Sequence, residues 1–239
     1  MEKNFLIKEH WTKNDIEKFQ NYLKQFSKGE KKGKWEQRIV NTSLPCIAVP
    51  SPIVNNIIKE ISKGNFLEFV NLWIWTYHTN TVIVGGLICK IKNFELMKSY
   101  LITYSQRADN WSTIDCLKFN FTKENKSKFI LFAKELLLST YTFSRRLGLI
   151  ILLKLCKDAN YIDEILDLSS SLKTEQEYYV NMANAWLLAE CFIRYREKTL
   201  NALKNKSFNK FTINKAISKC RDSFRVTKED KEMLLIFKQ

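Results

Sequence analysis

Apolar residues recur at helical spacing along almost the whole chain. Ile16, Phe19, Leu23 and Phe26 are three or four positions apart, which predicts a helix across residues 16–26. After a break at the prolines, Ser51 and Pro52 resemble the start of a helix that closes at Gly64. The same spacing predicts helices at 65–78, 81–91, 93–107, 109–119, 124–139, 142–156, 160–170, 174–195, 197–205, 212–223 and 228–237.

This succession of short helices predicts the fold class. The connections are short, and the chain holds only 6 glycines and 3 prolines, which argues against sheets with many hairpins. Residues 81–84 are β-branched enough for a strand, but no alternating partner strand accompanies them. About a dozen short helices suit stacked pairs better than a four-helix bundle. We therefore predict an all-α curved solenoid of antiparallel helix pairs, of the HEAT or armadillo type, forming one domain over residues 1–239.

Charge narrows the class of partner. Lysine and arginine number 39 against 25 aspartates and glutamates, so the net charge is +14. The basic residues form groups at 28–34, 118–128 and 204–225, which suits a long groove for a polyanion such as duplex DNA. The alternative is that the excess charge serves only solubility.

Other residue types exclude several classes of function. The six cysteines contain no CxxC pair and lie in helical patterns, so we expect reduced thiols rather than a disulfide framework or a zinc site. Two histidines supply a histidine-based metal site or hydrolytic triad poorly. Residues 1–13 lack the apolar segment of a signal peptide, and the apolar run at 147–153 is shorter than the roughly twenty residues of a membrane span. We predict a cytoplasmic protein with no membrane contact.

Trp111 and Asp115 are the first candidates for chemistry. They are four residues apart, so on a helix they share one face. An indole face and a carboxylate both stabilise a cation, and the carboxylate can also position a water molecule. The alternative is a packed tryptophan beside a capping or surface aspartate.

Two further segments carry candidate residues. Arg145 and Arg146 open a strongly apolar helix, where an arginine could bind a phosphate or merely form a salt bridge. Trp186 follows small residues that permit close helix packing, so it is either a core residue or a platform for a ligand.

Together these segments resemble the DNA alkylation repair family of alkylpurine glycosylases. The resemblance lies in the order of Trp-x-x-x-Asp at 111–115, then Arg146, then Ala-Trp at 185–186, then the closing segment at 214–221. It runs from about residue 60 to the C-terminus and is weaker over residues 1–50.

The resemblance implies an array of HEAT-like repeats that hydrolyses the glycosidic bond of N3- and N7-alkylated purines in duplex DNA. Asp115 would be the catalytic carboxylate, and Trp111 and Trp186 would flank the deoxyribose. Arg146 would contact the DNA backbone. The other residues expected to bind DNA are Arg145, Lys118, Lys215 and Arg221. The reaction would need no cofactor and no metal, and we expect a monomer.

Two positions depart from the family pattern. Ser112 stands where relatives often carry a second acid, and Met182 replaces a basic residue before the Ala-Trp segment. Two alternatives to a glycosylase stay open: a helical-repeat protein that binds damaged or branched DNA without catalysis, and a scaffold for protein partners.

Overall fold

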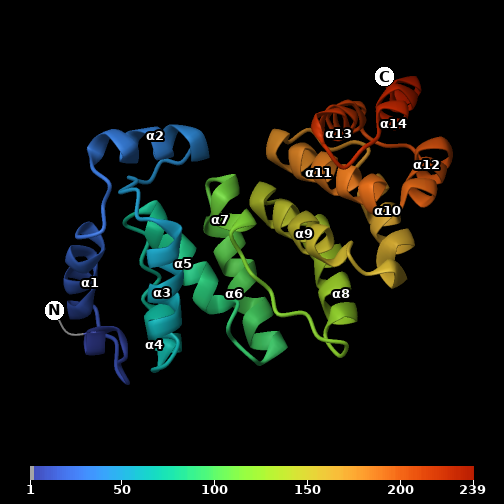
Figure 1. Cartoon of the computed structure of the whole chain (residues 1–239). Helices are drawn as coiled ribbons and strands as arrows, with labels where there is room; N and C mark the ends of the chain where they lie inside the picture. The colour runs from blue at the N-terminus through green and yellow to red at the C-terminus, as the bar shows by residue number, and fades with distance from the viewer. Residues whose placement is uncertain (1–2) are drawn as a thin grey trace. The chain divides into compact units, whose positions relative to one another are not determined.

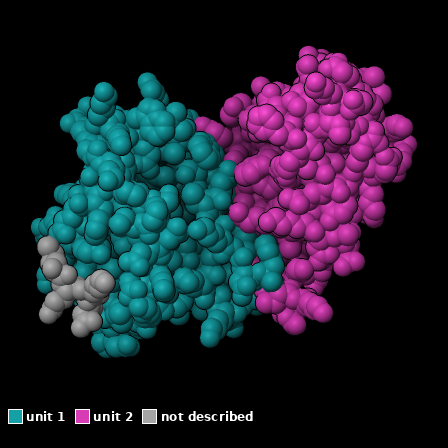
Figure 2. Space-filling view, viewed as in Figure 1, with its two compact units in different colours: residues 1–121 teal, residues 122–239 magenta. Residues whose placement is uncertain are grey.

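The computed structural model describes residues 3–239, and within that range every regular element is a helix. The chain divides into two compact units, Met1–Phe121 and Thr122–Gln239 (Figure 2). The all-α prediction is therefore confirmed. The curvature of the predicted solenoid stays a prediction.

Unit 1 is built around a central helix, α5. Its helices are η1 (Lys3–Leu6), α1 (Asn14–Lys24), α2 (Glu30–Val40), α3 (Ser51–Ile61), α4 (Phe66–Asn71), α5 (His78–Ile88), α6 (Phe94–Arg107) and α7 (Trp111–Asp115) (Figure 1). Helix α5 packs against α3, α4, α6 and α7. Most of its residues are buried, which agrees with a helix that is apolar nearly all round.

Unit 2 stacks helices in two rows. Its helices are α8 (Lys126–Leu137), α9 (Thr142–Leu155), η2 (Ala159–Tyr161), α10 (Ile162–Ser171), α11 (Tyr178–Arg194), α12 (Arg196–Asn205), α13 (Lys210–Asp222), α14 (Lys228–Met233) and η3 (Leu234–Phe237). Helix α9 packs on α11 and α11 on α13, while α8 packs on α9 and α10 on both α11 and α12. This arrangement of consecutive pairs agrees with the helix-pair prediction.

The sequence pattern placed most helices within a few residues and failed at three points. It missed α2, whose residues are mostly charged and leave only Gly33 and Val40 buried. The helix predicted at 65–78 ends at Asn71, and Trp73 adopts a left-handed φ of 44°. The helix predicted at 109–119 is only α7. Helix α2 has no buried apolar stripe that would predict it. At the other two points long-range contacts are present: the Trp73 ring packs near Trp75 and Tyr100, and α7 is bonded to Ser43 through Asp109 and to Tyr104.

Candidate active site and a neighbouring cleft

The strongest sequence candidates, Trp111 and Asp115, are the first and last residues of α7. Both side chains are half-buried, and their spacing of four residues places them on one face of the helix. The residues between them are buried, so the two candidates occupy the accessible side of this short element.

The start of α7 is fixed by hydrogen bonds. The Asn110 side chain caps the helix by accepting from the Thr113 amide at 2.9 Å. The Asp109 carboxylate accepts from the Thr42 hydroxyl at 2.9 Å and from the Ser43 amide and hydroxyl at 2.8 and 2.7 Å. Asp109 therefore ties the loop after α2 to the start of α7.

The electrostatics of Asp109 follow from these bonds. Burial by itself would raise the pKa of this carboxyl, but hydrogen bonds from Asn110, Ser43 and Thr42 outweigh burial and lower the pKa below its ordinary value. The ionised form is the one that these donors stabilise.

Tyr104 fixes α7 from its buried side. The fully buried hydroxyl donates to the Thr81 carbonyl of α5 at 2.9 Å and to the Thr113 carbonyl of α7 at 3.1 Å. Gly85 leaves room for this ring, because a side chain at that position would collide with the Tyr104 hydroxyl. A third tie is the Trp111 indole, whose Nε1 donates to the Ile39 carbonyl at the end of α2 at 3.3 Å.

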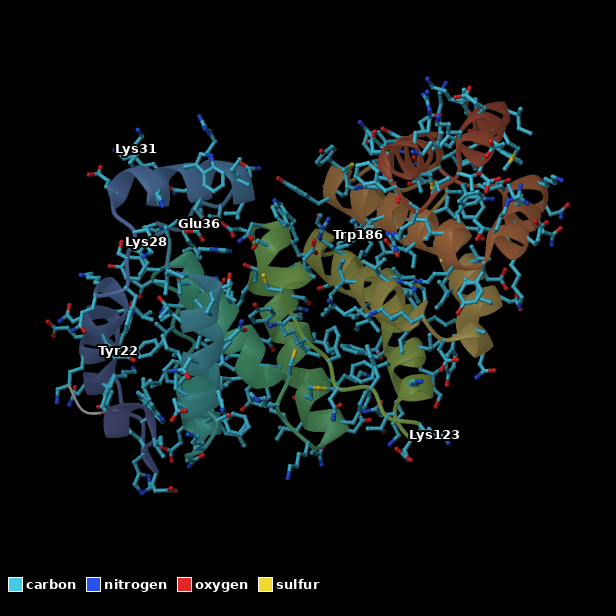
Figure 3. All side chains as sticks on the ribbon, in the orientation of Figure 1. Tyr22, Lys28, Lys31, Glu36, Lys123 and Trp186 are labelled. Carbon is cyan, nitrogen blue, oxygen red and sulfur yellow. The ribbon has the colours of Figure 1, made fainter. Side chains whose placement is uncertain are left out.

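In unit 2, Arg146 and Trp186 lie on adjacent helices. Arg146 is buried, and its guanidinium donates to the Tyr179 carbonyl at 2.6 Å. Trp186 is 39% exposed and projects from α11, seven residues after Tyr179 and hence near the same face (Figure 3). The predicted phosphate contact of Arg146 would thus come from a side chain already anchored to α11.

Arg145 has a different environment from Arg146. Its Nε and Nη2 donate to the two carboxylate oxygens of Glu175 at 2.7 and 3.2 Å, and Nη1 donates to the Ser139 carbonyl. Little of either side chain is exposed. A DNA phosphate would have to compete with this carboxylate for the guanidinium.

The remaining candidates for DNA contact are surface residues. Lys118, Lys215 and Arg221 are all exposed. Lys118 donates to the Asn55 side chain at 3.1 Å, and the Lys215 ammonium lies 5.8 Å from the centre of the Phe211 ring. Each could reach a phosphate without being withdrawn from the core.

Ser112 and Met182, the two positions that depart from the family pattern, are buried and half-buried respectively. Ser112 is buried, and its hydroxyl lies 3.7 Å from the Cys116 sulfur. Met182 is half-buried on α11, four residues before Trp186 and therefore near the same face.

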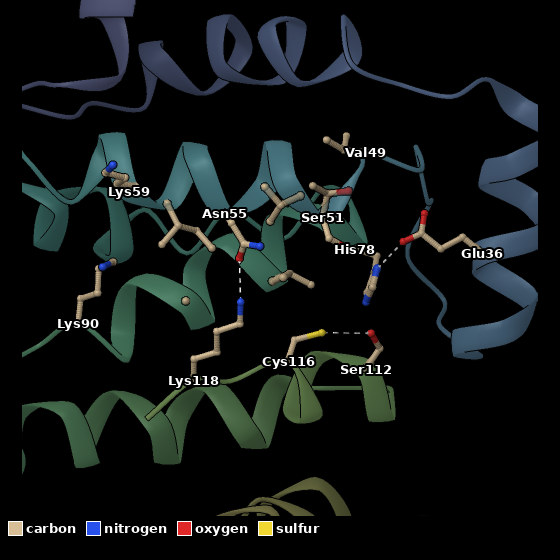
Figure 4. Close-up of a pocket in the computed structure, with 15 residues that line it drawn as sticks. Glu36, Val49, Ser51, Asn55, Lys59, His78, Lys90, Ser112, Cys116 and Lys118 are labelled. Carbon is tan, nitrogen blue, oxygen red and sulfur yellow. Dashed lines mark hydrogen bonds and ion pairs between the residues drawn. The ribbon is translucent and has the colours of Figure 1, made fainter. Parts of the chain in front are cut away.

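Unit 1 contains a cleft of about 440 Å³ that the sequence analysis did not predict. Helices α3, α5 and α7 line it, together with residues just after α5 and α7 (Figure 4). At one end the buried His78 ring meets Glu36, with Nδ1 3.0 Å from a carboxylate oxygen. The only signal was the polar run at residues 78–81, which stands at the start of an otherwise apolar helix.

Three side chains near this end could supply metal ligands. Ligand atoms of Glu36, Cys46 and His78 lie within 4.8 Å of one another, which makes them the one such group along residues 3–239. Burial raises the pKa of the Cys46 thiol to about 12, with Glu36 and Asp109 adding to the rise, so the thiol is protonated here. The predicted absence of a metal stays a prediction.

Comparison with known proteins gives one positive result. A family model described as DNA alkylation repair enzyme matches residues 7–220, which includes helices of both units and ends one residue before Arg221. No curated protein matches the chain significantly. In the part of the chain that the structure describes, no helix is both long and apolar enough to cross a membrane.

Proposed function

The chain belongs to the DNA alkylation repair enzyme family, which gives it a role in the repair of alkylated DNA, and we propose that it is a monofunctional DNA glycosylase. Its substrates would be cationic N3- and N7-alkylated purines, such as 3-methyladenine and 7-methylguanine, in duplex DNA. Removal of the base would leave an abasic site and begin base excision repair.

The proposed chemistry needs one carboxylate and no general acid to protonate the leaving base. Alkylation at N3 or N7 makes the base positively charged and therefore a good leaving group. As the glycosidic bond breaks, the deoxyribose gains oxocarbenium character. The Asp115 carboxylate would stabilise that charge and orient the attacking water, while the face of the Trp111 indole adds π density.

One observation carries this proposal: Trp111 and Asp115 share the accessible face of α7, a helix held at fixed points. Asp109 and Asn110 hold its start, and Tyr104 holds its buried side. A catalytic carboxylate gains most when its position is set before the substrate binds, because no reorganisation is then needed during the reaction.

Unit 2 is proposed to contribute DNA contacts. Trp186 would supply a second indole to the deoxyribose, and Arg146 would contact the backbone. Arg145 is proposed to act indirectly, because its ion pair with Glu175 fixes the start of α9. The exposed side chains proposed to bind backbone phosphates are Lys118, Lys215 and Arg221.

The direct test uses duplex DNA with a single 7-methylguanine. Asp115→Asn should slow release of the free base by about 10²- to 10³-fold, since the amide cannot oppose the developing charge. Duplex affinity, measured by fluorescence anisotropy, should change little. Asp163→Asn, an exposed aspartate of unit 2, is the matched control and should release base like the parent protein.

Each other outcome contradicts part of the proposal. Equal release by Asp115→Asn would remove that residue from catalysis. Duplex binding without release by the parent protein would favour the non-catalytic DNA-binding alternative. A protein that neutralises about six phosphates should show a log–log salt slope near −5, and salt-independent behaviour would favour a protein scaffold.

A further inference from the structure

The cleft of unit 1 has features of a ligand site that the proposed glycosylase chemistry does not use. Its volume, about 440 Å³, lies in the range of about 300–1,000 Å³ that small-molecule sites occupy. Ser112 and Cys116 of the α7 segment line it, whereas Trp111 and Asp115 do not; of the residues proposed above to act on DNA, Lys118 alone lines it. The cleft and the proposed active-site face thus use different sides of this segment.

One end of the cleft is positively charged. Lys59, Lys90 and Lys118 line it, and Figure 4 shows the first two at the end away from His78. Among the described residues, neither Lys59 nor Lys90 has a carboxylate partner. The one acidic residue of the lining, Glu36, is engaged by His78 at the far end. Two uncompensated ammonium groups beside a cleft favour an anionic group such as a phosphate.

The other end presents the buried His78 ring, one nitrogen of which has no hydrogen-bond partner among the described residues. The His78 side chain is only 5% exposed, its Nδ1 faces Glu36, and its Nε2 has no hydrogen-bond partner in the described protein. Figure 4 shows this nitrogen directed toward Ser112 and Cys116 across the cleft. Because Nδ1 is engaged by Glu36, Nε2 is the ring nitrogen that is left for a ligand. A ligand group that forms a hydrogen bond with Nε2 would give this buried nitrogen the partner that it lacks.

Between the two ends the wall is apolar. Val54 and Ile58 of α3 face Val82 of α5, and Gly86 lets Ile58 approach α5 closely, since a side chain at position 86 would collide with it. Such a wall suits the face of a ring or a sugar rather than a second charge.

We propose that this cleft binds a phosphorylated nucleoside, with the phosphate near Lys59 and Lys90 and the base near His78. The choice of a nucleoside over another organic group rests on the proposed function, because a protein that acts on DNA meets nucleotides. The phosphate, the apolar body and the polar edge of the base then match the three parts of the cleft in order. The nucleotide is either free or part of a DNA strand.

Cys116 provides a local probe of occupancy. It is exposed and lines the cleft, whereas Cys89, Cys156, Cys191 and Cys220 are buried. Its rate of alkylation by iodoacetamide in the full-length protein, measured by mass spectrometry of the Cys116 peptide so that the half-buried Cys46 does not contribute, reports on access to the cleft. A saturating deoxynucleoside monophosphate should slow this rate at least about fivefold, with half-protection at millimolar concentration or below.

Variants test the two halves of the site. Lys59→Met with Lys90→Met keeps the apolar stems, removes both ammonium groups and should raise the half-protecting concentration at least about tenfold. Lys18→Met, which removes an exposed lysine of α1, is the control and should have no effect. Val82→Phe, checked for folding by circular dichroism, should abolish protection by filling the apolar wall.

Other ligands decide the source and the specificity. Equal protection by inorganic phosphate or by the unphosphorylated nucleoside would overturn the proposal, as would no protection by any deoxynucleoside monophosphate up to about 10 mM. Protection by a single-stranded oligonucleotide that the double lysine variant loses would support the site with a DNA strand as the source. No glycosidic bond breaks in this assay, so its failure leaves the glycosylase proposal standing, and loss of base release leaves the nucleotide site standing.

Discussion

The two units treat their buried polar groups differently. In unit 2 the Ser169 hydroxyl donates to the Asn184 side-chain oxygen, and the Asn184 amide donates to the Ser169 carbonyl. The Thr212 hydroxyl donates to Asn181, and Arg145 forms a bidentate ion pair with Glu175. In unit 1 buried atoms lack partners at Trp11, Gln20, Glu36, His78 and Asn80. Thr199 is the corresponding case in unit 2, among the described residues.

This contrast indicates which unit has unused hydrogen-bonding groups for a ligand. Satisfied polar groups fix helix packing and leave little for a ligand, whereas an orphaned group stores a free-energy cost that a ligand can relieve. The cleft of about 440 Å³ lies in unit 1, beside two of these orphans, Glu36 and His78. In unit 2 the buried polar groups thus mainly hold helices together, whereas unit 1 combines fixed points around α7 with unfilled hydrogen-bonding capacity.

The largest loss of stability is expected when the buried ion pair of unit 2 is broken. Arg145→Met would remove the charged partner of the Glu175 carboxylate, whose side chain is 8% exposed, and leave it the backbone amides of Gln176 and Glu177. We expect the free energy of unfolding to fall by about 3 kcal/mol. Urea unfolding measures the loss, and hydrogen exchange should place it in α9 and α11.

Arg194→Met is the matched control for this loss. Its partner Glu190 keeps a second guanidinium from Arg225, so little stability should be lost. If Arg145→Met instead leaves stability unchanged and weakens duplex binding, Arg145 contacts DNA directly. The Arg145–Glu175 pair would then not be one of the interactions that hold unit 2 together.

A smaller effect is expected at the fixed start of α7. Asp109→Asn weakens the bonds from Thr42 and Ser43 and should cost about 1 kcal/mol, discounted for partial exposure. Because the pKa of Asp109 is lowered in the folded protein, its stabilisation is present above the ordinary aspartate value. It is lost as the pH falls through the folded pKa.

The difference in unfolding free energy between Asp109→Asn and the parent protein should therefore be present at about pH 7 and shrink below about pH 4. Asp163→Asn supplies the baseline, because the exposed Asp163 side chain has a single ion pair among the described residues, with Lys198, in place of this network. A gap that stays constant with pH would mean that the Asp109 charge does not fix α7.

The smallest change is expected in the salt dependence of duplex binding when a charge is added to α11 of unit 2. Met182→Lys puts a basic side chain on α11, four residues before Trp186. If this face meets the DNA backbone, the salt slope of duplex binding should steepen by about 0.9. Leu131→Lys adds the same charge at an exposed position of α8 as a control. Equal slopes for Met182→Lys and the parent protein would separate this face from the DNA.

The local pattern of apolar residues was sufficient to predict the helices that have a continuous apolar stripe. Helices α6, α9 and α12 lie within about two residues of their predicted ends, which is the usual spread of helix boundaries. The spacing of Trp111 and Asp115 likewise predicted a shared face, because that depends only on helical geometry.

Long-range contacts decided the rest. Helix α7 stops after Asp115, and its anchors come from Thr42, Ser43 and Tyr104 rather than from neighbours in the sequence. The start of the cleft joins Glu36 to His78, which are 42 residues apart. Periodicity, charge and motif order thus determined the fold class and the family by themselves, since each is a local or compositional property. Only the tertiary structure decided which polar groups find partners, because that depends on which distant segments pack together.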